Sequence, residues 1–163
     1  MDEASASTHD QAGLRRLIEA AIRAPSGDNC QPWSFQIEGP RRIVIRTVPE
    51  RAKSFFDYKS CATFLSMGAV IENMRIQAAS EGGSIRVSSE NDGEGCPRAV
   101  SVQLVPDTND RVSPDRVEAM FQRTVNRRPF LPRPVPASTL AQLTADPVAQ
   151  TRVRMITERS EIG

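Results

Sequence analysis

The stretch LIEAAIRAPSGDNCQPWSF, residues 17–35, joins a helical sequence pattern to a strand pattern. On its N-terminal side, apolar residues spaced three and four apart predict an amphipathic helix over residues 10–24, which Pro25 ends. On its C-terminal side, residues 33–37 alternate apolar and polar side chains, as half-buried strands do. The change of period across one polar loop predicts a fold that combines helices with a sheet.

Length and composition limit the classes of protein to which the chain can belong. Its 163 residues, 39% of them hydrophobic, have room for one core, and we expect one globular unit. A net charge of +1 gives no general attraction to nucleic acid or to an anionic membrane, so neither is an expected partner. No apolar run approaches the roughly 20 residues that span a bilayer, and the polar N-terminus is unlike a signal peptide. We therefore expect a cytoplasmic protein.

Cysteine and histidine usage argues against metal and nucleophilic chemistry. Cys30, Cys61 and Cys96 lack the spacing of a zinc site and are odd in number, so we expect free thiols and no metal site. The single histidine, His9, lies in a segment predicted to be a disordered tail, which leaves a Ser-His-Asp or Cys-His mechanism without its base. Cys30 lies in the polar loop, where a packed or spectator thiol is the better interpretation than a reactive one.

Beyond the loop, strand and helix patterns follow in an order typical of an α+β protein. A hairpin-like pair of strands at 33–37 and 43–48 precedes a long helix at 60–81. Asp57 and Tyr58 stand just before that helix as candidates to cap it or to line a pocket, and neither role is assigned. That helix is apolar on more than one side, so it is either central to the core or shared with a partner subunit. The remaining predicted elements are strands at 84–89 and 99–105, a helix at 113–123 capped by Ser113, an extended proline-rich segment at 128–136, a helix at 137–143 and a strand at 152–157. We predict a mixed or antiparallel sheet surrounded by helices, with one long central helix.

The loop combines residue types that suit a ligand as well as a turn. Gly27 allows another group to approach the backbone closely, and Asp and Asn tolerate unusual φ angles. Neutral hydrogen-bonding side chains stand here beside an aromatic one, in the set Ser26, Asn29, Gln31 and Trp33. This set favours a planar, uncharged ring with donors and acceptors over a metal ion or a phosphate. The alternative is a plain connection between helix and strand.

These residues resemble the signature of the FMN-dependent nitroreductase superfamily, in which a helix leads into an A-P-S-x-x-N-x-Q-P-W segment and then a strand. The matching positions are Ala24, Pro25, Ser26, Asn29, Gln31, Pro32 and Trp33. The resemblance implies contacts with the flavin ring, commonly across a dimer interface, from Pro25, Ser26, Gly27 and Asn29. It implies a supporting role for Gln31, while Trp33 is expected in the core.

Two later segments resemble the same superfamily. Residues 66–84 are similar to its long dimer helix, although an ordinary core helix would carry the same small residues. Residues 121–143 are similar to its R-R-S-x-R element, whose Arg and Ser residues hold the FMN phosphate, and guanidinium groups suit phosphate oxygens. The implied phosphate cluster is Arg123, Arg127 and Arg128. Its spacing departs from the family pattern, so the role is assigned to the cluster as a group, and a solvated arginine patch is the alternative.

The order of the three segments is similar to a double-length branch of the superfamily, in which one chain carries two related halves. On this interpretation residues 1–9 are a disordered tail, residues 10–105 form a first half, and residues 106–163 begin an incomplete second half. The flavin site is then expected to be completed by a second copy of the chain, in a homodimer, or by the missing half.

The resemblance implies an FMN-dependent oxidoreductase that transfers hydride from NAD(P)H to the flavin and then to a small-molecule acceptor such as a nitroaromatic or a quinone. Because the cofactor carries that chemistry, no catalytic side chain is assigned. One alternative is a flavin-binding or regulatory protein with the same fold and no turnover. Another is an interaction module that uses residues 128–136 as a polyproline ligand.

Overall fold

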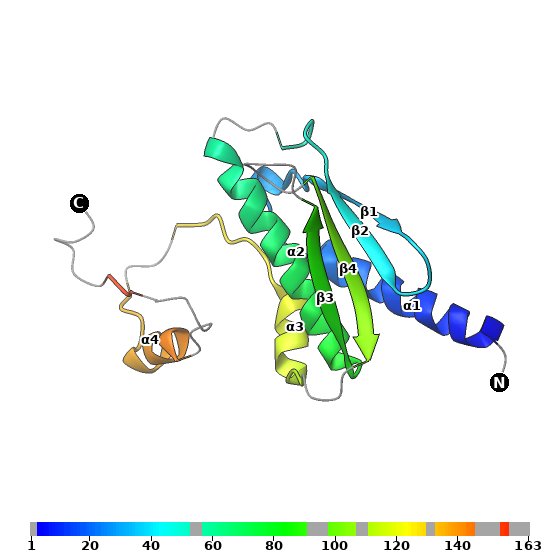
Figure 1. Ribbon diagram of the computed structural model, residues 1–163. Helices are drawn as coiled ribbons and strands as arrows, with labels where there is room; N and C mark the ends of the chain where they lie inside the picture. The colour runs from blue at the N-terminus through cyan, green and yellow to red at the C-terminus, as the bar shows by residue number, and fades with distance from the viewer. Residues whose placement is uncertain are drawn as a thin grey trace. The chain divides into compact units, whose positions relative to one another are not determined.

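A computed structural model of the chain describes residues 3–52, 57–90, 98–106, 111–129, 133–145 and 154–156, with the backbone alone described for residues 3–10 and Glu90. The chain divides into two compact units, residues 1–124 and residues 125–163 (Figure 1). The first unit holds the sheet and the loop of residues 24–35. In the second unit, the described helix is α4 (Ala137–Thr144), which confirms the helix predicted at 137–143.

The first unit is built on a four-stranded antiparallel sheet with strand order β1-β2-β4-β3. Its strands are β1 (Trp33–Ile37), β2 (Arg42–Thr47), β3 (Gly83–Glu90) and β4 (Ala99–Pro106). β1 and β2 form the predicted hairpin, whose turn contains Gly39 at φ +75°, a conformation that glycine adopts without strain. Because β4 is inserted between β2 and β3, the two later strands join the hairpin through contacts that are distant in sequence. The α+β class is confirmed, with the antiparallel form of the sheet.

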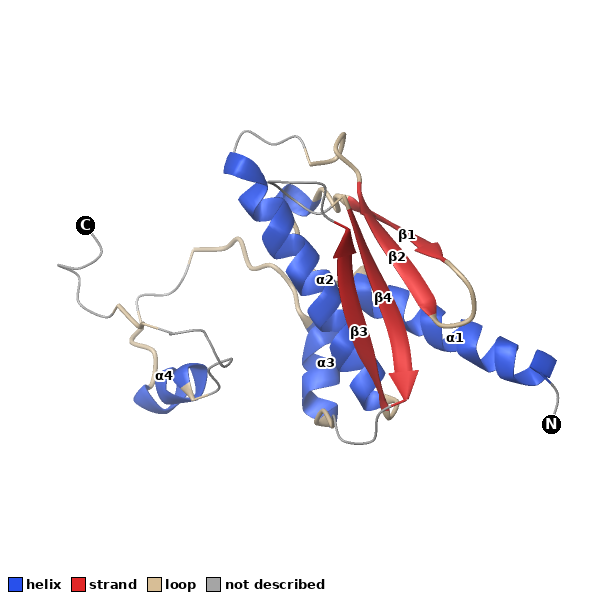
Figure 2. Cartoon of the chain, in the orientation of Figure 1, coloured by secondary structure: helices blue, strands red, loops and turns tan. Residues whose placement is uncertain are grey.

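Three α-helices of this unit lie on one side of the sheet (Figure 2). They are α1 (Glu3–Ala21), α2 (Cys61–Ser80) and α3 (Pro114–Gln122), with short 3-10 turns at η1 (Gly27–Asn29) and η2 (Tyr58–Ser60). α2 ends as predicted, with Gly82 in the left-handed region at φ +75°. It is central to the core, because buried residues occur along most of its length.

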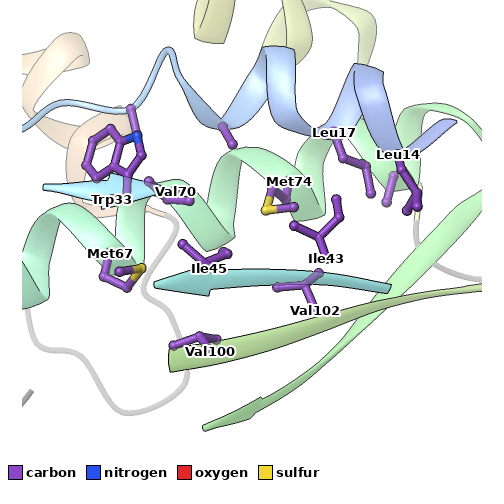
Figure 3. Packing of buried hydrophobic residues seen from close by; sticks show 13 residues of the cluster. Leu14, Leu17, Trp33, Ile43, Ile45, Met67, Val70, Met74, Val100 and Val102 are labelled. Atoms are coloured by element: carbon purple, nitrogen blue, oxygen red, sulfur yellow. The ribbon is translucent and has the colours of Figure 1, made fainter. Parts of the chain in front are cut away.

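The core lies between α1, α2 and the sheet (Figure 3). Alternate residues of β2 and β4 point into it, so Ile43, Ile45 and Val102 have no exposed surface. From the helices, the core receives Leu14, Leu17, Met67, Val70 and Met74. Trp33 joins it with 3% of its surface exposed, as predicted, and fixes the exit of the polar loop.

Several expectations about the elements differ from the structure. α1 begins at Glu3, so helical backbone extends into residues 1–9, where a disordered tail was predicted. Ser113 takes the extended N-cap conformation before α3 but its side chain makes no capping hydrogen bond. Of the strand predicted at 152–157, the described residues 154–156 are not in a strand.

The position of α3 also bears on the predicted division of the chain. Met120 packs against Ala20 and Ile76, so α3 belongs to the first unit although it follows the predicted boundary at 105/106. The single globular unit expected from length is therefore two compact units. The interpretation of the chain as one half and the start of another stays a prediction.

Candidate functional site

The polar loop folds as a tight turn held by its own hydrogen bonds. The Ser26 hydroxyl accepts a hydrogen bond from the Gln31 backbone N–H at 2.9 Å, which ties the two ends of the loop together. Within it, the Asn29 N–H donates to the Ser26 carbonyl at 3.1 Å and the Cys30 N–H donates to the Gly27 carbonyl at 2.9 Å. Ser26 therefore has a structural role in the loop, while its predicted flavin contact stays a prediction.

Three non-glycine residues of the loop adopt positive φ angles. Asp28 has φ 49°, Asn29 has φ 55° and Gln31 has φ 45°. Asp and Asn tolerate this region through local hydrogen bonding, whereas Gln31 has no such advantage. A run of left-handed residues persists only where the surrounding structure holds it, so this loop is a locally strained segment.

The N-terminus of α2 faces the loop and is capped by Asp57. The Asp57 carboxylate accepts hydrogen bonds from the backbone N–H of Ala62 at 2.8 Å and from both the N–H and the hydroxyl of Thr63. The bond from the Thr63 hydroxyl is the main reason that the pKa of Asp57 lies below its ordinary value. Both roles that the sequence left open are observed, since Asp57 also lines a hollow beside the loop.

Two adjoining hollows lie where the loop meets α2. One, of about 180 Å³, contains two carboxylates and is lined by Gly27, Asp28, Cys30, Pro32, Ala52, Asp57, Ala62, Thr63 and Ser66. The other, of about 220 Å³, has an entirely uncharged lining of Pro25, Ser26, Gly27, Ala62, Leu65 and Ser66. A Cβ atom at Gly27 would lie 3.7 Å from the Cβ of Ala62, an ordinary van der Waals contact, so a methyl group fits there without a clash.

Only some of the residues predicted to contact the flavin ring line these two hollows. Pro25, Ser26 and Gly27 line the uncharged hollow together. Asn29 is exposed and Gln31 is partly buried, and neither lines a hollow. Among the described residues, the side-chain amides of these two have no hydrogen-bond partner.

The predicted phosphate cluster is divided between the two units. Arg123, just after α3, donates a hydrogen bond from Nη2 to the carbonyl of Arg23 at 2.9 Å. Arg127 and Arg128 belong to the second unit and are exposed, and the N–H of Arg128 is bonded to the side chain of Asn126. The phosphate role of the cluster stays a prediction.

Three residues of α2 near the loop were not predicted from the sequence, namely Ala62, Ser66 and Asn73. Ala62 and Ser66 contribute to both hollows, and their spacing of four residues places them on one face of α2. Small residues four apart in the first two turns of a helix are the signal that could have identified them. Asn73 donates from its amide to the carbonyl of Ala20 at 3.0 Å, a contact between helices that no local pattern reveals.

In the part of the chain that the structure describes, no three His, Cys, Asp or Glu side chains gather in a way that could hold a metal ion. In the same residues, no helix has the length and apolar character needed to cross a membrane. Cys30 and Cys61 are free thiols, as predicted, and Cys96 lies outside the described residues.

Comparison with known proteins gives three relatives, all from Mycobacterium tuberculosis. No protein-family model matches the chain. It is 28% identical over 147 residues to "Uncharacterized protein MT1398" of strain CDC 1551 / Oshkosh, which covers 90% of this chain and 20% of the relative. It is 25% identical over 144 residues to "Putative NAD(P)H nitroreductase MT3217" of the same strain and to "Putative NAD(P)H nitroreductase Rv3131" of strain ATCC 25618 / H37Rv. Each of these alignments covers 87% of this chain and 42% of the relative. The chain is thus similar, over most of its length, to less than half of longer proteins, two of which carry a nitroreductase name.

Proposed function

We propose that the chain supplies one wall of the flavin site in an FMN-dependent oxidoreductase of the nitroreductase type. The observation that carries the proposal is the uncharged hollow that Pro25, Ser26 and Gly27 of the polar loop form with α2. The similarity to two proteins named as NAD(P)H nitroreductases supports the reaction class.

The chemistry of the two hollows favours one of them for the flavin ring. The hollow that contains Asp28 and Asp57 carries two acidic side chains, whereas the lining from Pro25 to Ser66 carries none. Ligand sites are commonly apolar with a few placed polar groups, and the uncharged hollow has this character with Ser26 and Ser66 as its polar members. We therefore assign the ring to the uncharged hollow.

The residues of the chain would act by binding and orientation. When bound, FMN would supply the chemistry, taking hydride from NAD(P)H and passing it to a nitroaromatic or quinone-like acceptor. Pro25, Ser26 and Gly27 would lie against the ring, and the amides of Asn29 and Gln31 would be available as donors. The exposed Arg127 and Arg128 belong to the second unit, and their phosphate role stays a prediction from the sequence.

The same region also carries the surface by which the site would be completed. Leu65 is 76% exposed, Tyr58 is 73% exposed and Phe64 is 37% exposed, and Leu65 lines the uncharged hollow. Large exposed apolar side chains beside a ligand hollow are typical of an interaction surface. We propose that a second copy of the chain, or the part of a longer protein that the relatives contain, covers these residues and closes the site.

Reconstitution with FMN, followed by a turnover assay, tests the function. We expect the protein incubated with excess FMN and desalted to retain the flavin absorption band, and to oxidise NADH or NADPH in the presence of a quinone or nitroaromatic acceptor. Retained flavin without oxidation of either nicotinamide would replace the enzyme with the flavin-binding or regulatory alternative. A colourless protein would contradict both.

A further inference from the structure

The C-terminal end of α1, just before the polar loop, receives two donors from other helices. Asn73 Nδ2 of α2 donates to the Ala20 carbonyl at 3.0 Å, and Arg123 Nη2 donates to the Arg23 carbonyl at 2.9 Å. The Ala20 carbonyl also accepts the Arg23 N–H at 3.1 Å, and a cation near the C-terminal end of a helix interacts favourably with the helix dipole. Both contacts therefore stabilise the backbone from which the loop departs.

Packing of α3 brings Arg123 to this position. Met120 is 7% exposed and packs against Ala20 of α1 and Ile76 of α2. The ring of the next residue, Phe121, has its centre 6.0 Å from the Arg23 guanidinium carbon, within the range of a cation–π contact. Residues at the end of α3 therefore contact Arg23 twice. The Phe121 ring contacts the Arg23 side chain, and the Arg123 guanidinium contacts the Arg23 carbonyl.

The loop needs such support because of its strained backbone. Its exit is fixed where Trp33 enters the core and where the Pro32 carbonyl accepts a hydrogen bond from the Val48 N–H at 3.0 Å. Its entrance has the two side-chain bonds from α2 and α3. Left-handed non-glycine residues persist only where the surrounding structure holds them, so we expect both ends of the loop to be held.

We propose that Asn73 and Arg123 are positioning residues, which hold the loop of residues 25–31 in its binding conformation by fixing the end of α1. The proposal rests on the proposed function of the loop. It reassigns Arg123, because a guanidinium bonded to the Arg23 carbonyl acts on the ring-binding loop and not on the FMN phosphate.

Riboflavin separates the two roles of Arg123, because it carries the same ring as FMN without the phosphate. A phosphate ligand contributes to FMN binding alone, whereas a positioning residue contributes equally to both flavins. In Asn73→Ala and Arg123→Gln we expect the Kd values for FMN and riboflavin to rise by the same factor, roughly three- to tenfold, the loss of one hydrogen bond. Arg123→Lys, which keeps a donor and the charge, restores part of the affinity.

Hydrogen exchange gives a second readout that needs no flavin. The backbone amides of Asn29, Cys30 and Gln31 are hydrogen-bonded within the loop, so their exchange reports its conformation. We expect these amides to exchange several-fold faster in Asn73→Ala and Arg123→Gln, while the amides of β2 and β4 are unchanged. The matched controls are Gln36→Ala and Arg86→Gln, which alter exposed side chains on the sheet and are expected to change neither exchange nor affinity.

The outcomes are distinct for the two proposals. A rise in the Kd for FMN with an unchanged Kd for riboflavin in Arg123→Gln would overturn the positioning role in favour of a phosphate contact. Unchanged exchange of the three loop amides in both variants would overturn it independently. If the unaltered protein binds neither flavin, the proposed function fails, and the exchange experiment still decides whether Asn73 and Arg123 hold the loop.

Discussion

The effect of replacing Asp57 on the free energy of unfolding can be predicted quantitatively, because the Asp57 carboxylate caps the N-terminus of α2. The residue at the N-cap position, Ser60, makes no capping bond, while Asp57 accepts hydrogen bonds from Ala62 and Thr63. Replacing a capping Asp by Ala costs about 1 kcal/mol, and up to about 2 kcal/mol where the helix depends on the cap. Since α2 is central to the core, we expect Asp57→Ala to lower the free energy of unfolding by about 1–2 kcal/mol.

Urea denaturation followed by Trp33 fluorescence measures this loss, since Trp33 is buried and is the single tryptophan. With an m value of about 1.5 kcal/mol per M, the midpoint should fall by about 0.7–1.3 M, at unchanged m. Asp57→Asn, which keeps an acceptor oxygen without the charge, should lose less. Thr63→Val removes one of the donors, leaves the backbone bond to Ala62 and should also lose less.

The stability difference between the unaltered protein and Asp57→Ala should also depend on pH, in a direction set by the pKa of Asp57. The pKa of Asp57 is lowered in the folded protein, chiefly by the Thr63 hydroxyl. Its stabilisation is therefore fully present above the unfolded value of about 3.9 and is lost as pH falls through the lower folded value. The gap between the unaltered protein and Asp57→Ala should be constant from pH 7 to 5 and narrow below about pH 4. Equal midpoints at pH 7, or a gap that widens in acid, would refute the capping role.

Three further predictions concern other parts of the first unit. Arg16→Gln breaks the ion pair between Arg16 and Glu81, whose side chains are 50% and 29% exposed and share two hydrogen bonds. The loss of stability should be less than about 1 kcal/mol and should shrink in high salt, which urea midpoints at low and high salt would measure. Met74→Ala creates a cavity at a fully buried position and should cost about 2–5 kcal/mol by the same assay, and a loss below 1 kcal/mol would show that the core is not packed as described. Gly82→Ala, at φ +75° after α2, should lower the thermal midpoint, whereas Gly13→Ala within α1 should leave it equal or higher.

The parts of the fold that follow from local periodicity could be predicted from the sequence. The short apolar run of β2 and the alternating pattern of β4 identify these strands, although burial does not alternate in β2, where Ile43, Val44 and Ile45 are all buried. The apolar sides of α2 indicate its central place. Residues 3–9 were not predicted as helix, because they are rich in Ala and Ser and lack the apolar spacing that marks a buried face.

The contacts that organise the candidate site are long-range and were not predictable in this way. The insertion of β4 between β2 and β3 depends on pairings across distant segments. Arg123 was singled out as a cation for a phosphate, but its position in the structure depends on how α3 packs against α1 and α2. For the same reason, no local pattern identifies Asn73 as a partner of α1, although the loop from Pro25 to Gln31 was identified by its residue types.

An equilibrium titration with FMN of the unaltered chain, Gly27→Ala and Gly13→Ala tests the central claim most directly. The added methyl at Gly27 meets Ala62 at an ordinary 3.7 Å, so it occupies the proposed ring site without disturbing the fold, while Gly13 lies in α1 away from the loop. The account predicts that FMN binds the unaltered chain and Gly13→Ala equally, and binds Gly27→Ala roughly tenfold more weakly at an unchanged thermal midpoint, the effect of losing about 1.4 kcal/mol of ring contact. Equal binding of FMN by all three proteins, or by none, would contradict it.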